Sequence, residues 1–279
     1  MPFTLANVRG RACLVSEDGY YDLERISNGS LTPDPMTAVS RHEELGSIVL
    51  SGKPDGPIDH AVLGPPLPRP RQVFAIGFNY GSHSTETGFD NPEQPLVFPK
   101  WVSCIAGPSG DIVVHSPEID FEGELVVAIG TSCKGVPAGH ALEHVAGFMV
   151  GQDFSDRVTQ FAAKPAQFGL GKSYPGFGPI GPVLVSIDSF EDPNDLVLTT
   201  EVNGVTRQNA RTSAMLYSVG QLIEYLSAIL PLYPGDLIFT GTPEGVCFPN
   251  GPYLQPGDVV TTTIEGIGTL TNRCIEPID

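Results

Sequence analysis

Residues 121–130 read FEGELVVAIG, and this stretch decides the fold. Its apolar part, ELVVAIG at 124–130, is too short for a typical helix and predicts a strand. The strand opens with Glu122-Gly-Glu124, in which two carboxylates stand two residues apart. Side chains at that spacing on a strand point to the same face. The sequence therefore predicts a core strand that carries an acidic pair where it enters the core.

Further strands are predicted on both sides of this run. They are QVFAIGFNY (72–80), a hairpin in LVLTTEVNGVTRQ (196–208), LIFTGT (237–242) and VVTTTIEGIGTLTN (259–272). The hairpin is indicated by Asn203-Gly204 between β-forming residues. The last two strands each follow a Pro-Gly-Asp turn.

One segment, 212–230, has helical periodicity. Its apolar residues recur every three or four positions and form one stripe: Met215, Val219, Leu222, Leu226 and Ile229. Most of the predicted elements are strands, and few are helices. The sequence therefore predicts a β-rich α+β fold with the helices at its rim.

Composition excludes several classes of protein. The 279 residues contain 15 Lys and Arg against 32 Asp and Glu, for a formal charge of −17. Such acidity argues against nucleic acid or an anionic membrane as a partner. No apolar run approaches the roughly 20 residues of a membrane span, and the first residues lack the layout of a signal peptide. Five cysteines without a CxxC pair indicate reduced thiols in a cytoplasmic protein.

The Pro-rich stretch PPLPRPR at 65–71 has the composition of a stiff linker. We therefore expect a small N-terminal domain over 1–70 and a larger domain over 71–279.

The acidic pair suggests a metal site. Two carboxylates 4 Å apart repel by about 4 kcal/mol at an effective dielectric constant of 20, and a divalent cation would relieve this. Asp153 follows another apolar stretch, AGFMV, and offers a third carboxylate. With no convincing His or Cys ligand, such a set selects Mg²⁺, Mn²⁺ or Ca²⁺ over Zn²⁺. The alternatives are a solvent-exposed pair at Glu122 and Glu124, and a helix N-cap at Asp153.

Two further motifs carry candidate chemistry. His83 and Glu86 stand at i and i+3 in NYGSHSTETG, so on a helical turn the Glu would orient the His as a base for water. The segment has the composition of a lid, and two solvated loop residues are the alternative. Lys172 lies among glycines in FGLGKSYPGFGPIGP, where its charge could approach an oxyanion or a carboxylate.

Three other patterns carry less weight. GLGKS resembles the end of a phosphate loop, but Ala166 stands where that motif starts with Gly. Gly176, Gly178 and Gly181 are interrupted by Pro179 and lack a strand-to-helix context. The i, i+4 pair in AGHALEHVAG (138–147) has no third ligand and is interpreted as an ordinary helix surface.

Taken in order, the motifs resemble those of the fumarylacetoacetate hydrolase family. They are FAIGFNYGSHSTETG, FEGELVVAIG, GQDFSDRVTQF, GKSYPGFGPIGP, VNGVTRQ, PGDLIFTGTPEGV and IEGIGTLTN, over about residues 72–274. The resemblance implies a mixed β-sandwich roll preceded by a small N-terminal domain, and a homodimer.

The resemblance also implies roles for individual residues. The metal ligands would be Glu122, Glu124 and Asp153. The catalytic residues would be His83, Glu86 and Lys172, the first two as a dyad on a lid that orders over bound ligand. The residues that contact substrate would be Gln160, Thr242 and Tyr80. The chain departs from the family pattern at Gln152 (often Asn), Val158 (often Asp) and Pro175 (often Asp).

The expected activity is cleavage of a C–C bond in a small 2,4-diketo acid of the acylpyruvate type. A divalent cation, Mg²⁺ in the first place and Mn²⁺ or Ca²⁺ otherwise, would bind the 2-oxo acid. His83, polarised by Glu86, would deprotonate water, and Lys172 would stabilise the oxyanion or hold the carboxylate. The same site would also suit decarboxylation of oxaloacetate or isomerisation of a 2-oxo diacid. A non-catalytic metal-binding homologue is a further alternative.

Overall fold

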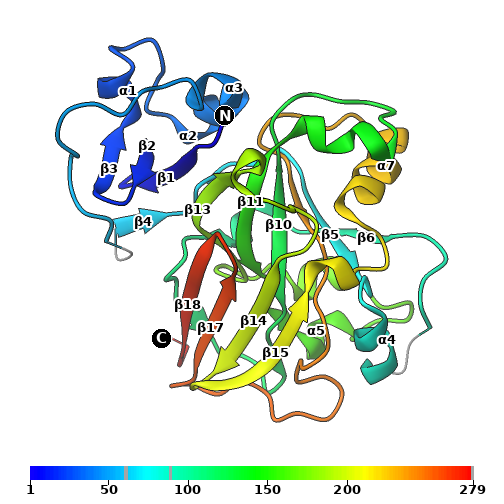
Figure 1. Ribbon diagram of the computed structural model, residues 1–279. Helices are drawn as coiled ribbons and strands as arrows, with labels where there is room; N and C mark the ends of the chain where they lie inside the picture. Colours follow the sequence, from blue (N-terminus) through cyan, green and yellow to red (C-terminus); the bar gives the residue numbers. More distant parts are fainter. Residues whose placement is uncertain (60–61, 88–89, 278–279) are drawn as a thin grey trace.

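The computed structural model describes residues 1–59, 62–87 and 90–277, and these residues form one large sheet, a second, smaller sheet and one two-stranded sheet. Figure 1 shows their arrangement. The large sheet contains, in spatial order, β3 (Gly19–Asp22), β2 (Arg11–Ser16), β1 (Thr4–Val8), β13 (Gly178–Ser186), β11 (Val145–Gln152), β10 (Gly123–Ile129), β16 (Leu237–Phe239), β5 (Val73–Gly77) and β6 (Leu96–Pro99). Two short strands complete it: β4 (Leu63–Gly64) pairs with β1, and β7 (Ile105–Ala106) pairs with β13.

The second sheet contains β15 (Val205–Arg211), β14 (Val197–Val202), β17 (Val259–Ile264), β18 (Gly268–Ile275) and β8 (Ile112–Val113). A separate pair joins β9 (Ile119–Asp120) to β12 (Ser155–Asp156). The predicted β-rich fold is confirmed.

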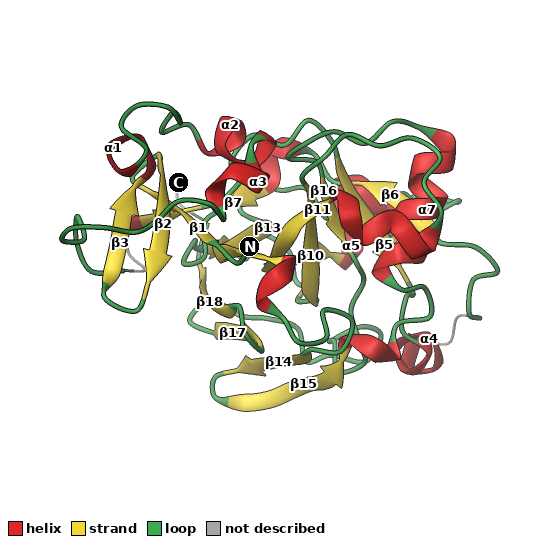
Figure 2. Cartoon of the chain, turned by 45° about the horizontal axis from the view of Figure 1, so that its top comes forward, coloured by secondary structure: helices red, strands yellow, loops and turns green. Residues whose placement is uncertain are grey.

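Short helices lie around the edges of the sheets (Figure 2). The α-helices are α1 (Leu23–Ile26), α2 (Pro35–Ser40), α3 (His42–Leu45), α4 (Gly81–Thr87), α5 (Arg157–Gln160), α6 (Phe168–Gly171) and α7 (Val219–Ile229). The 3₁₀ turns are η2 (Val102–Cys104), η3 (Ala138–His144), η4 (Ile187–Ser189) and η5 (Thr212–Ala214). Within the described residues, no helix has the length and apolar character needed to cross a membrane.

The central strand β10 is buried along its whole length. Leu125 and Val127 enter a core that the second sheet and α7 also supply, whereas Val126 and Ala128 enter a second core on the opposite face. Because both faces of the strand are covered, neither set of positions tolerates polar side chains. This explains why the run after Glu124 is continuously apolar.

The N-terminal segment forms the lobe drawn in blue in Figure 1 and extends the large sheet. β1 pairs antiparallel with β13, with Leu5 opposite Leu184, so hydrogen bonding continues from the lobe into the roll. Leu67, within the Pro-rich stretch, is fully buried in the second core. The boundary near residue 70 stays a prediction.

Two elements differ from the sequence expectation. The helix expected over 212–230 begins at Val219, because Ser218 and Gln221 form a capping box that starts it there. The residues before it are held elsewhere, since the Leu216 N–H donates to the Asn79 carbonyl at 2.8 Å. The strand expected over 259–272 is a hairpin, β17 and β18, that turns at Gly266, whose φ is +75°.

Two other expectations are confirmed. The hairpin at Asn203-Gly204 turns with φ values of 53° and 76°, the positive pair that a type I′ turn requires. All five cysteines are buried free thiols.

Burial predicts unequal consequences for two residues of the same helical stripe. Leu222 is 1% exposed and Ile229 is 63% exposed. We expect Leu222→Ala to lower the free energy of unfolding by about 2–5 kcal/mol. The control Ile229→Ala should change it by less than about 0.5 kcal/mol. Urea denaturation measures both, and equal losses would contradict the helix packing described here.

Candidate functional site

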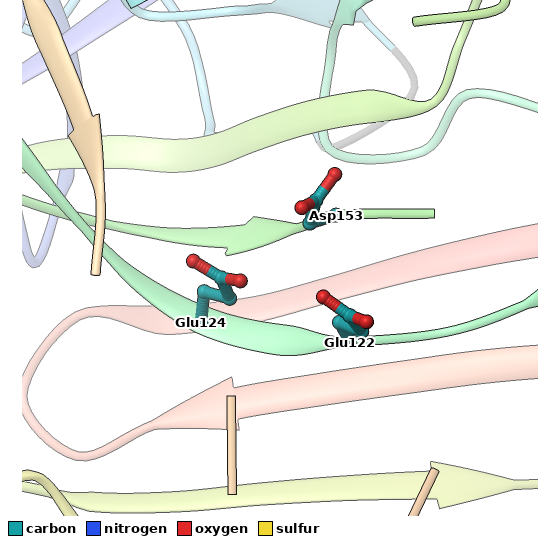
Figure 3. Close-up of side chains that lie close together, drawn as sticks. All are labelled: Glu122, Glu124 and Asp153. Carbon is teal, nitrogen blue, oxygen red and sulfur yellow. The ribbon is translucent and has the colours of Figure 1, made fainter. Parts of the chain in front are cut away.

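Three carboxylates meet where β10 and β11 pair. Glu122 directly precedes β10, Glu124 lies in it, and Asp153 directly follows β11. Figure 3 shows their side chains gathered on one face of the two strands. Each offers an oxygen within 4.8 Å of the others, and the Asp153 N–H donates to the Glu122 carbonyl at 2.9 Å. The shared face follows from the two-residue spacing. Glu122 and Glu124 are buried, and Asp156 caps α5, so both alternatives, a solvated pair and an N-cap at Asp153, are wrong.

Two glutamine side chains, Gln208 from the second sheet and Gln152 from β11 of the large sheet, position the backbone of Glu122-Gly-Glu124. The Gly123 N–H donates to Gln208 Oε1 at 3.0 Å, and the Glu122 N–H donates to Gln152 Oε1 at 2.9 Å. A Cβ at Gly123 would lie 2.2 Å from Thr200 Oγ1, so glycine is required between the two glutamates. Gln152, one of the departures from the family pattern, therefore supports a metal-ligand candidate.

Two buried lysines face the carboxylates. Lys172 Nζ lies 2.7 Å from Glu122 Oε2 and 2.9 Å from Asp153 Oδ2. Lys100 Nζ donates to Asp153 Oδ1 at 2.6 Å and also to the backbone carbonyls of Lys172 and Phe177. Sequence reasoning missed Lys100, whose only signal is a lysine directly after the short apolar run LVFP.

A buried arginine, which sequence reasoning also missed, joins this network of charged side chains. Arg157, the first residue of α5, donates to Asp120 Oδ2 from Nε at 2.9 Å and from Nη2 at 2.6 Å. It also donates to Glu122 Oε1 at 2.7 Å and to Gln160 Oε1 at 2.9 Å. The sequence signal was its place in GQDFSDRVTQF, but nothing local showed that Asp120 would pair with it.

The environments of the two glutamates differ. Burial alone would raise the pKa of Glu122, but Lys172 and Arg157 outweigh it and lower that pKa to about 2. For Glu124, burial and then the Asp153 and Glu122 carboxylates raise the pKa well above its usual value.

Glu124 is the carboxylate that protein groups stabilise least. It accepts the Gly241 N–H at 2.8 Å, but no Lys, Arg or His in the described chain lies within 4.0 Å of its oxygens. Three oxygen donors with one charge uncompensated fit a hard divalent cation. The triad could therefore bind such a metal, as its residue types predict.

A small pocket of about 30 Å³ borders this cluster at Glu122. His83, Lys172, Gln160 and Thr242 line it together with Glu122. The structure thus brings four of the predicted catalytic and substrate-contacting residues to one cavity. Their roles stay predictions.

The expected dyad lies on α4. His83 Nδ1 is 3.6 Å from Glu86 Oε2, close enough for ion pairing but longer than a hydrogen bond. Both Glu86 carboxylate oxygens accept the Gly245 N–H at 3.1 Å, and Ser82 donates to Glu244. The helix is therefore docked on the loop after β16 and places His83 at the pocket wall.

Tyr80 does not lie among the pocket-lining residues. It is 1% exposed, and its hydroxyl has no hydrogen-bond partner among the residues that the structure describes. Burial, with Glu124 nearby, raises the pKa of Tyr80. The expected substrate contact stays a prediction.

The candidate pair His140 and His144 lies on η3, where His140 contacts Glu143 at the surface.

Comparison with known proteins assigns the family. Residues 72–275, most of the chain, match the family described as Fumarylacetoacetate (FAA) hydrolase C-terminal. The protein belongs to the fumarylacetoacetate hydrolase family, as the ordered motifs predicted.

Three similar proteins define the comparison further. A Bos taurus protein named oxaloacetate tautomerase FAHD2A, mitochondrial, is 40% identical over 214 residues, 75% of this chain and 68% of its own length. The structure of a fumarylacetoacetate hydrolase from Exiguobacterium antarcticum superimposes with a TM-score of 0.86 at 35% identity, covering 99% of this chain and 100% of that one. The structure of fumarylpyruvate hydrolase from Pseudomonas aeruginosa, in complex with Mn²⁺ and pyruvate, gives a TM-score of 0.67 at 31% identity, covering 74% and 90%.

The role of Lys100 can be tested by stability. Lys100→Met leaves the buried Asp153 without the Nζ donor at 2.6 Å. Removing one partner of a buried pair lowers the free energy of unfolding by about 3–5 kcal/mol. The matched control is the exposed Lys53→Met, which should change it by less than about 0.5 kcal/mol. Chemical denaturation of both variants measures the difference, and a neutral Lys100→Met would contradict the network.

The raised pKa of Glu124 predicts a pH effect on the metal-free protein. Because the folded-state pKa lies above the ordinary 4.5, this group's contribution to the free energy of unfolding falls as pH rises from 4.5 through the folded-state pKa. Glu124→Gln removes that loss. We therefore expect the variant to gain stability relative to wild type as pH rises above 4.5, measured by thermal unfolding in chelator. Exposed Glu143→Gln is the control, and a parallel pH profile for Glu124→Gln and wild type would contradict the prediction.

When metal is present, Glu124→Gln should make the protein less stable than wild type instead of more stable. Mg²⁺ at 100 times its Kd should raise the wild-type free energy of unfolding by about 2.7 kcal/mol. Glu124→Gln should lose most of this gain, because one of three oxygen ligands becomes a neutral amide. Equal stabilisation of both proteins would exclude Glu124 as a ligand.

Proposed function

We propose that the protein is a divalent-metal-dependent hydrolase that cleaves the C3–C4 bond of a 2,4-dioxo acid. One observation carries the proposal: His83, Lys172 and Glu122 line a single pocket. Behind that lining, Glu86 lies 3.6 Å from His83, and the carboxylates of Glu124 and Asp153 cluster with that of Glu122. A non-catalytic homologue would have no need to keep all three groups together.

The cation, Mg²⁺ in our proposal, would be held by Glu122, Glu124 and Asp153. When bound, it would supply positive charge to the oxygens of a 2-oxo acid, which gain negative charge as the bond breaks. Lys172 lines the same pocket, so its ammonium adds a second positive charge beside these oxygens.

His83 would perform the proton transfer. Its ring is stacked on Phe78 with the ring centroids 5.8 Å apart, and Glu86 stabilises the protonated imidazole. His83 accepts a proton from water as the water oxygen adds to C4. The C3–C4 electron pair then passes to C3, which takes up the proton that His83 removed from water, so His83 returns to its neutral form. The products are a carboxylic acid from the acyl side and pyruvate, so atoms and charge balance.

A second candidate is keto–enol tautomerisation of a 2-oxo diacid. The relative named oxaloacetate tautomerase favours it. The same residues would move a proton between C3 and the 2-oxo oxygen without breaking a carbon bond. Decarboxylation of oxaloacetate would also use the same charges but release CO₂. Homodimeric assembly and a cytoplasmic location stay predictions.

Product analysis tests the proposal. With Mg²⁺ or Mn²⁺ and a panel of 2,4-dioxo acids and oxaloacetate, we expect mass spectrometry to find pyruvate and the acyl carboxylate. His83→Gln should lower kcat by about 10²- to 10⁴-fold while keeping the stabilisation by metal, because His83 is not a ligand. The control is His140→Gln at the exposed η3 surface.

Two outcomes would contradict the proposal. Tautomerisation without cleavage would support the second candidate. Full turnover in the presence of chelator would exclude a metal-dependent reaction of any of these kinds.

A further inference from the structure

The pocket over the carboxylates has a strongly aromatic wall. Five of its thirteen lining residues are phenylalanines: Phe78, Phe98, Phe161, Phe168 and Phe248. All except Phe98 are only partly buried, so their rings present surface to the cavity instead of filling the core. Three of the rings adjoin the polar groups of the site: Phe78 stacks on His83, and Phe98 and Phe248 lie under the cations of Lys172 and Arg157. Phe161 and Phe168 extend this surface away from them.

These rings form one continuous surface. Phe168 meets Phe98, Phe161 and Phe78 edge-on, with ring centroids 5.6, 6.0 and 6.2 Å apart. Phe161 in turn stacks on Phe248 with centroids 5.0 Å apart and planes 27° apart. Edge-on and offset contacts at these distances are the favoured geometry of aromatic clusters. A planar apolar group could extend the same pattern.

The backbone at these phenylalanines also indicates a functional surface. Phe78 has a φ of 55°, in the left-handed region that bulky residues rarely adopt. Such strain concentrates at functional sites, where the surrounding structure holds it. Phe161 ends α5 and Phe168 begins α6, so the wall is assembled from separate elements.

The charge pairing in the pocket argues against a second anionic subsite. Its Lys and Arg side chains are Lys172 and Arg157. Arg157 is already paired with Asp120 and Glu122, and its guanidinium lies 5.6 Å over the Phe248 ring. Lys172 is paired with buried carboxylates of the metal cluster. A carboxylate placed against the phenylalanines would lose its hydration without gaining a cation of its own.

We infer that this wall is the subsite for the acyl end of the substrate, and that it takes an apolar, preferably aromatic, acyl group and not a second carboxylate. This assignment rests on the proposed function, because it divides the pocket into a metal end that binds the 2-oxo acid and an aromatic end that binds the substituent on C4. The substrate class is a 4-aryl- or 4-alkyl-2,4-dioxobutanoate.

A matched pair of inert ligands tests the subsite without turnover. 2-Oxo-4-phenylbutanoate and 2-oxoglutarate share the 2-oxo acid and the chain, and differ in ending in a phenyl group or a carboxylate. With the Mg²⁺-loaded protein, titration calorimetry should give a Kd at least about tenfold lower for the phenyl ligand. Equal binding, tighter binding of 2-oxoglutarate, or no binding of either would overturn the inference.

Variants locate the effect. Phe161→Ala and Phe248→Ala should each weaken the phenyl ligand by about tenfold and leave 2-oxoglutarate unchanged. Phe161→Leu, which keeps an apolar side chain and the packing, should lie between. Phe190→Ala, whose ring packs on Phe148 outside the pocket, is the control and should affect neither ligand. Equal weakening of both ligands would mean a structural role for the ring.

Kinetics separate this inference from the proposed function. If the protein hydrolyses 2,4-dioxo acids but prefers 2,4-dioxohexanedioate over 2,4-dioxo-4-phenylbutanoate in kcat/KM, the inference is wrong and the proposed function stands. If neither is hydrolysed yet the phenyl ligand keeps its advantage in binding, the proposed function is wrong and the aromatic subsite stands.

Discussion

The carboxylates of Glu122, Glu124 and Asp153 repel one another in a place where little water screens them. Lys100, Lys172 and Arg157 compensate two of the three, and Glu124 is left as a carboxylate whose pKa rises. The fold maintains this arrangement because the strands that carry it are buried on both faces. A doubly charged ion is the ligand whose binding would stabilise such a cluster most.

The two sheets have separate tasks at this site. The large sheet supplies the carboxylates, because the antiparallel strands β10 and β11 meet where β10 begins and β11 ends, with Gly123 opposite Gln152. The second sheet supplies the Gln208 amide, whose oxygen accepts the N–H of the glycine between the two glutamates. The short helices α5 and α6 add Arg157 and Lys172 and the edge of the aromatic wall.

Much of the site could be predicted because its signals are local. The spacing of Glu122 and Glu124, the i, i+3 pair at His83, and the order of the motifs are all visible along the chain. The error in the start of α7 has the same origin: the apolar period extends to Met215, but a tertiary hydrogen bond at Leu216 competes with the helix. Periodicity reports which residues share a face and not where a cap begins the helix.

The sequence by itself determined the β-rich class, the family, and the residue types that a metal and a water-activating pair require. Tertiary structure alone decided which cations neutralise the cluster, since Lys100 and Asp153 are 53 residues apart and Arg157 and Asp120 are 37 apart. It also decided that phenylalanines from separate elements form one wall. Local pattern encodes the direction of a side chain on its own element, whereas charge pairing and cavity shape depend on which elements the folded chain brings together.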